Sequence, residues 1–119
     1  MKKILLVDDD ARMLRLLKKY LEGQYEVYPV NSGGDALAFL DKEKPDVILL
    51  DYMMPVIDGP HTLELIRKKE GCEKIPVIFL TGVTSKDRVA ECLSYEPDGY
   101  MVKPVAKEEV LLKLGQLFN

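Results

Sequence analysis

Cysteine, histidine and long apolar runs are all scarce in this chain of 119 residues. The two cysteines, Cys72 and Cys92, have neither the density of a disulfide framework nor the spacing of a metal-binding motif, so we expect reduced thiols. The first apolar run, residues 4–7, is shorter than the roughly 7 to 15 residues of a secretory signal, and no other run approaches a membrane span. These absences favour a cytoplasmic protein with no membrane segment.

Excess positive charge, repeats and linkers are also missing. The formal net charge of -3 is not that of a general nucleic-acid-binding surface, so we expect no direct contact with nucleic acid. Composition is that of an ordinary soluble globular protein, with 47% hydrophobic and 31% charged residues. At this length we expect a single domain, residues 1–119, with no effector domain in the chain.

Apolar runs and helical patterns alternate along the chain. The runs predict strands at residues 3–7, 25–30, 47–50, 75–80 and 100–102, and the helical spacing of apolar residues predicts helices at 11–22, 35–42, 59–70, 85–93 and 107–118. This alternation indicates an α/β fold, in which a parallel sheet with right-handed crossovers carries helices on both faces. The uninterrupted aliphatic run at 47–50 is typical of a central strand, whereas Pro29 indicates an edge strand.

The helix ends and faces give finer expectations. Asp10 can cap the first helix, and Thr84 with Asp87 resembles a capping box for the fourth. Three residues are expected on the inward face of that fourth helix: Val89, Cys92 and Leu93.

Four of the expected strands end on residues that can carry chemistry. Asp8 and Asp9 follow the first strand, Asp51 ends the third, Thr81 the fourth, and Lys103 follows the fifth. Carboxyl ends of parallel strands meet at one edge of a sheet, which is where such folds bind ligands. We therefore expect these five side chains to form one site.

Three carboxylates at one edge require a cation. Two unit charges 4 Å apart repel by about 4 kcal/mol at an effective dielectric constant of about 20. Oxygen-only donors favour a hard cation, and Mg²⁺ suits a small open site, while Lys103 adds a second positive charge. A carboxylate nucleophile in such a site fits phosphoryl transfer to Asp51.

The residues at these strand ends resemble one family, the receiver (CheY-like) domain of two-component response regulators. The segments ILLVDDD, LLDYMMPVIDG, FLTG and YMVKP stand where that family has its acidic pair, phosphoacceptor loop, hydroxyl residue and Lys-Pro step, over essentially the whole chain. The resemblance implies a flavodoxin-like sheet of strand order 2-1-3-4-5. It also implies a signalling switch that accepts a phosphoryl group from a histidine kinase or a histidine phosphotransfer protein.

The same resemblance assigns the metal site and the acceptor. Asp51 is expected to be phosphorylated and to share Mg²⁺ with Asp9, which binds directly, and Asp8, which binds through water. The backbone carbonyl of Met53 completes the implied ligands, and Asp10 is left to its capping role.

The resemblance also assigns a switch. Thr81 is expected to hydrogen-bond the phosphoryl group, Lys103 to contact it, the Lys103–Pro104 bond to be cis, and Tyr100 to turn inward. Thr81 could instead merely end a strand, Lys103 could be solvated, and Tyr100 could be a plain half-buried aromatic residue, but their joint occurrence at matched strand ends favours the functional interpretation. An unidentified effector domain or target protein would read the switch, and phosphorylation-linked dimerisation is a further hypothesis.

Two positions beside the site suggest a long-lived phosphorylated state. Met53 and Val83 lie two residues after Asp51 and Thr81, and both are apolar where a polar side chain could orient an attacking water. We therefore hypothesise slow self-dephosphorylation.

Two alternatives remain open. A phosphohydrolase of the haloacid dehalogenase type would carry a second Asp two residues after its nucleophile, where this chain has Met53, and would have a cap domain, which does not follow here. A phosphorylation-independent interaction module of the same fold would be favoured by loss of Asp51, Thr81 or Lys103, and all three are present. We expect a domain that catalyses only its own phosphorylation and dephosphorylation, and not an enzyme that turns over a metabolite.

Overall fold

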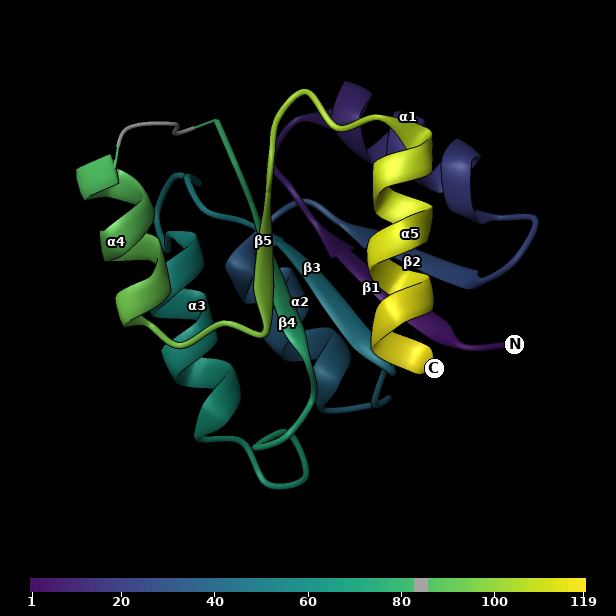
Figure 1. Ribbon diagram of the computed structural model, residues 1–119. Coiled ribbons are helices and arrows are strands. Elements are labelled where there is room, and N and C mark those ends of the chain that lie inside the picture. The colour runs from purple at the N-terminus through teal and green to yellow at the C-terminus, as the bar shows by residue number, and fades with distance from the viewer. Residues whose placement is uncertain (83–85) are drawn as a thin grey trace.

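The computed structural model describes residues 1–82 and 86–119, in which strands and helices alternate (Figure 1). The strands are β1 (Lys3–Val7), β2 (Glu26–Val30), β3 (Val47–Asp51), β4 (Val77–Thr81) and β5 (Gly99–Val102). The helices are α1 (Ala11–Leu21), α2 (Gly33–Leu40), α3 (Gly59–Arg67), α4 (Lys86–Ser94) and α5 (Lys107–Phe118).

The strands form one parallel sheet of order β2-β1-β3-β4-β5, as predicted. The chain adds β2 on one side of β1 and then returns to place β3 on the other side, so the direction of winding reverses beside β1. Pro29 lies exposed on the edge strand β2, where its missing N–H interrupts no ladder between two strands.

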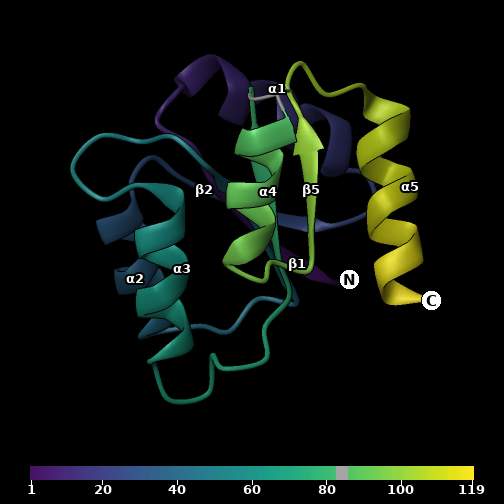
Figure 2. The same ribbon diagram turned by 60° about the vertical axis from the view of Figure 1, so that its left-hand side comes forward.

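Helices cover both faces of the sheet (Figures 1 and 2). Leu5, Val7 and Leu50 belong to a core cluster with residues of α2, α3 and α4. Their strand neighbours Leu6 and Leu49 pack into a second cluster with α1 and α5. All residues of β3 and β4 are buried, which confirms the prediction for the aliphatic run at 47–50. Burial of each large aliphatic side chain contributes roughly 1.5–3 kcal/mol, so the strand ends are held on a rigid frame.

Side chains at the starts of α1, α2 and α3 satisfy free backbone N–H groups. Asp10 caps α1 as predicted, and its carboxylate accepts a 2.9 Å hydrogen bond from the Arg12 N–H. Ser32 and Asp58 cap α2 and α3 in the same manner. Thr84 lies outside the described residues, so the predicted capping box stays a prediction.

The structure corrects the inward face of α4 and two helix ends. Cys92 is buried and Leu93 is 49% exposed, because one residue along a helix turns by about 100° and the buried stripe is narrow. Helix α2 ends at Leu40, earlier than the predicted Lys42, because the Lys42 N–H bonds to the carbonyl three residues back in a tightened last turn. Helix α3 ends at Arg67 and not near residue 70 for the same reason.

Cys72 and Cys92 are buried free thiols. Burial, helped by the nearby Glu91 charge, raises the pKa of the Cys92 thiol, which makes it less reactive. Within the described residues, every helix is too short or too polar to traverse a lipid bilayer.

Candidate functional site

The five predicted site residues lie at the carboxyl ends of the strands, which form one edge of the sheet. Asp8 and Asp9 follow β1, Asp51 and Thr81 end β3 and β4, and Lys103 follows β5. Asp8, Asp51 and Thr81 are 1%, 5% and 2% exposed, whereas Asp9 is open to solvent. Two buried carboxylates on adjacent strands have to be compensated, because burying a charge without a partner is costly.

Lys103 supplies part of this compensation. Its Nζ lies 2.8 Å from Asp8 Oδ2 and 3.1 Å from Asp51 Oδ1, so one ammonium group bridges the two buried acids. The other oxygen of Asp8 accepts a 2.9 Å hydrogen bond from the Asp10 N–H. The Lys103–Pro104 bond is cis, as expected, and the Lys103 N–H donates to the Thr81 carbonyl at 2.8 Å. The ends of β4 and β5 are therefore joined directly beneath the site.

One lysine does not neutralise the whole cluster. Burial, followed by repulsion from Asp8, raises the pKa of Asp51 to about 7, even though Lys103 acts in the opposite direction. Burial lowers the pKa of Lys103, but its bonds with Asp8 and Asp51 outweigh that effect and leave the pKa above its ordinary value. The site thus holds a fixed ammonium and an acid that is only partly ionised near neutral pH.

The acid cluster fits a small hard cation. Asp8, Asp9 and Asp51 each offer a carboxylate oxygen, and these atoms lie within 4.8 Å of one another. An all-oxygen group with excess negative charge is the donor set that Mg²⁺ prefers. Met53 follows in the adjoining loop with its side chain 60% exposed, and the expected role of its carbonyl stays a prediction.

The loop between β3 and α3 folds back onto the backbone at Asp51. The Gly59 N–H donates to the Tyr52 carbonyl at 2.9 Å. A Cβ atom on Gly59 would lie 2.4 Å from the Asp51 carbonyl oxygen, so only glycine permits this approach. The capping carboxylate of Asp58 then starts α3 beside the site.

Thr81 and Tyr100 occupy the positions expected for a switch, although their switching roles stay predictions. Thr81 is buried at the end of β4. Tyr100, on β5, is half-buried and packs against the core cluster shared with α4. Val83 lies outside the described residues.

Sequence reasoning missed a contact between the acceptor strand and α4. The Tyr52 hydroxyl donates a 2.9 Å hydrogen bond to Glu91 on α4. The ring of Tyr52 packs edge-on against that of Phe79, with 5.2 Å between the ring centroids. Burial, and then the bond to Glu91, raises the pKa of Tyr52 above its ordinary value. A tyrosine directly after Asp51 was the visible signal, but nothing in the spacing identified its partner, 39 residues away.

Known proteins share this arrangement over nearly all of the chain. The family model described as the response regulator receiver domain matches residues 4–114. The transcriptional regulatory protein ResD of Bacillus subtilis is 38% identical over 118 residues, which are 98% of this chain and 48% of ResD. The chain therefore spans about half the length of such curated relatives.

Solved structures agree with the sequence comparison. The chemotaxis protein CheY4 of Vibrio cholerae matches with a TM-score of 0.90 and 32% identity over 98% of both chains. The receiver domain of a sensor histidine kinase from Pseudomonas aeruginosa PAO1, with a magnesium ion coordinated in its active site cleft, has a TM-score of 0.89 and 28% identity over 97% of this chain and 95% of its own. The chain belongs to the response regulator receiver domain family.

Proposed function

We propose that this receiver domain takes its phosphoryl group on Asp51, from the phosphohistidine of a histidine kinase or phosphotransfer protein. The observation that carries the assignment is the placement of Asp51, which is buried at the end of a central strand and lies 3.1 Å from the Lys103 ammonium. Asp8 and Asp9 belong to the same cluster, but both oxygens of Asp8 are engaged, one by Lys103 and the other by the Asp10 N–H, and Asp9 is exposed. The family membership supports the phosphoryl-accepting role.

The transfer is a displacement at phosphorus. A carboxylate oxygen of Asp51 forms the new P–O bond as the P–N bond to the donor histidine breaks, and the imidazole leaves with the bonding electrons and takes up a proton. Lys103, already aimed at this carboxylate, offsets negative charge on the phosphoryl oxygens. Mg²⁺ held by Asp8, Asp9 and Asp51 would supply further charge neutralisation when bound.

Phosphorylation then changes the balance of charge around Asp51. The new group carries about 1.5 to 2 negative charges and offers strong acceptor oxygens to Lys103 and to the Thr81 hydroxyl. Lys103 would shift its contacts from Asp8 toward the phosphoryl group, and Thr81 with Tyr100 would bias the surface formed by α4 and β5. A shift from mostly inactive to mostly active takes about 5.5 kcal/mol, a sum that several charge-assisted bonds reach.

An effector domain or separate target protein would read that surface. ResD and TrcR are both named transcriptional regulatory proteins, which supports the control of transcription as one class of output. The buried reduced thiols are consistent with a cytoplasmic setting for the phosphorelay, which we also propose.

Incubation with acetyl phosphate and Mg²⁺, followed by intact mass measurement at mild pH, tests the proposal. One added phosphoryl group is expected on the native protein, and none on Asp51→Asn or in the presence of EDTA. An adduct that persists in Asp51→Asn would refute the assignment. No adduct from either acetyl phosphate or a phosphorylated histidine phosphotransfer protein, with the fold intact, would favour the interaction-module alternative.

A further inference from the structure

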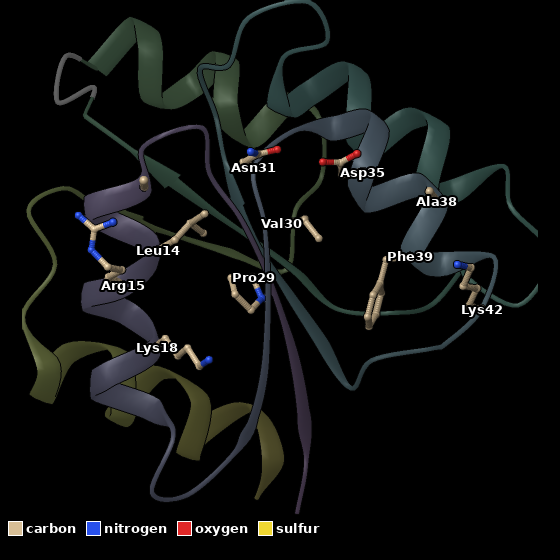
Figure 3. Close-up of a pocket in the computed structure, with 11 residues that line it drawn as sticks. Leu14, Arg15, Lys18, Pro29, Val30, Asn31, Asp35, Ala38, Phe39 and Lys42 are labelled. Atoms are coloured by element: carbon tan, nitrogen blue, oxygen red, sulfur yellow. The ribbon is translucent and has the colours of Figure 1, made fainter.

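A groove of about 640 Å³ lies between α1 and α2, over the exposed edge of the sheet at β2. We call it the α1–α2 groove. Figure 3 shows Leu14, Arg15 and Lys18 along one wall and Ala38, Phe39 and Lys42 along the other. None of the residues of the phosphorylation site lines it, so it is a separate surface.

The two walls have matching helical spacing. Residues 11, 14, 15 and 18 line the groove from α1, and residues 35, 38, 39 and 42 line it from α2 and the turn that follows. Each set follows the i, i+3, i+4, i+7 pattern, so each wall is a stripe about 10 Å long. A groove lined by two such stripes is the kind of surface in which helix-in-groove recognition seats one short helix.

The floor of the groove, formed by Pro29 and Val30 of β2 together with the half-buried wall residues Leu14 and Phe39, is apolar and does not favour the addition of a strand. Leu14, Val30 and Phe39 are half-buried in the groove, and Pro29 is exposed between them. The Glu26 N–H and the Val30 carbonyl bond toward β1, so the alternate residues of β2, including Pro29, turn their backbone groups outward. Since Pro29 has no N–H, an added strand could not form a complete ladder of backbone hydrogen bonds with this edge. A molecule bound in the groove therefore has to be recognised by the side chains that line it.

The rim is positively charged in a protein whose net charge is -3. Arg15, Lys18 and Lys42 are exposed, and within residues 1–82 and 86–119 none of them forms an ion pair. Asp35 lies at the opposite end of the groove, near the carboxyl edge of the sheet (Figure 3). The groove therefore combines an apolar floor with exposed cations and one acidic end.

We propose that the α1–α2 groove docks an acidic amphipathic helix of a partner protein. The apolar side chains of that helix would cover Leu14, Val30 and Phe39, and its carboxylates would pair with Arg15, Lys18 and Lys42. An apolar floor gives a nucleic-acid backbone nothing to bind, so a protein partner fits better than nucleic acid.

The test uses a synthetic helical peptide of about 15 residues, the length at which isolated helices become stable, with leucine on one face and glutamate on the other. Amide chemical shifts of the isotope-labelled native protein are expected to change at Leu14, Val30 and Phe39. Fluorescence anisotropy of the labelled peptide gives the affinity. Reversal of two rim charges, in Lys18→Glu with Lys42→Glu, is expected to weaken binding about tenfold and to confer binding of a peptide with lysine in place of glutamate.

A matched control carries the same change of net charge outside the groove, in Lys19→Glu with Lys68→Glu. It is expected to bind the acidic peptide within about twofold of the native protein. Both double variants should still accept a phosphoryl group from acetyl phosphate, which verifies their folds independently of docking. Equal weakening by the two double variants, shift changes confined to other surfaces, or a DNA duplex that displaces the peptide from these amides would each overturn the proposal.

Discussion

Replacement of Asp51 by asparagine is expected to stabilise the metal-free domain, although it removes the proposed phosphoacceptor. In the native protein this carboxyl shares the Lys103 ammonium with Asp8, and burial together with the Asp8 charge raises its pKa to about 7. An asparagine of the same shape keeps the packing and removes one of three clustered negative charges. Lys103 remains paired with Asp8 in the variant.

The magnitude follows from the pKa. A rise from 3.8 to about 7 corresponds to about 4 kcal/mol, at roughly 1.4 kcal/mol per pH unit. Water at the open edge of the sheet and loss of the Lys103 contact reduce this gain, so we expect about 2 kcal/mol at pH 8. Because the folded pKa is the higher one, the native domain binds more protons than the unfolded chain between about pH 4 and 7 and loses stability as the pH rises through that window.

Urea denaturation in EDTA at pH 5 and pH 8 measures this directly. From pH 5 to pH 8, the free energy of unfolding of the native protein should decrease by more than that of Asp51→Asn. Added Mg²⁺ should stabilise the native protein at pH 8 and have little effect on the variant, because bound ligand adds RT ln(1 + [L]/Kd). Glu64→Gln, an exposed change on α3, serves as the control and should stay within about 0.5 kcal/mol of native. Equal stabilities of the native protein and Asp51→Asn in EDTA at pH 8 would show that the Asp51 charge does not destabilise the metal-free fold.

Four further changes test other parts of the account. Lys103→Gln leaves two buried acids without their cation; phosphorylation by acetyl phosphate should slow at least tenfold, and an unchanged rate by mass spectrometry would contradict the role. Tyr52→Phe removes the hydrogen bond to Glu91 and should lower the free energy of unfolding by about 1 kcal/mol in urea titrations. An unchanged free energy of unfolding would show that this bond does not stabilise the fold. Gly59→Ala forces a Cβ against the backbone carbonyl of Asp51 and should lower the free energy of unfolding, measured in urea, by about 2–3 kcal/mol. An unchanged free energy of unfolding would show that the loop relaxes around the added Cβ. Met53→Asn should shorten the life of the phosphorylated protein, which in the native form should last minutes or longer; native decay within seconds would exclude slow self-dephosphorylation.

Much of the site could be predicted because each of its five residues lies at the carboxyl end of a strand or just after it. The aliphatic runs before Asp8 and Asp51 fix where those carboxylates leave the core, and parallel strands bring their carboxyl ends to the same edge. The position of Pro29 on the edge strand followed from its missing N–H. Local chemistry along the sequence was sufficient in each case.

Contacts across distant elements could not be predicted in the same way. The Tyr52–Glu91 hydrogen bond and the bridge that Lys103 makes to both acids depend on side-chain rotamers and on how α4 and β5 sit against the sheet. The prediction that Leu93 faces inward was wrong for a related reason. Helical spacing defines the face of a helix that packs on the sheet, but not the width of the stripe that the sheet covers. The raised pKa of Asp51 is likewise a product of burial and neighbours that only the fold assembles.

Chemical location of the phosphoryl group decides whether Asp51 is the acceptor. Reduction of the phosphorylated protein with borohydride converts an acyl phosphate to homoserine, and peptide mass spectrometry then identifies which of the clustered aspartates was modified. We expect homoserine at Asp51 alone, at a level that matches the phosphorylation seen by intact mass. Homoserine at Asp8 or Asp9, or phosphorylation with Asp51 unmodified, would contradict it.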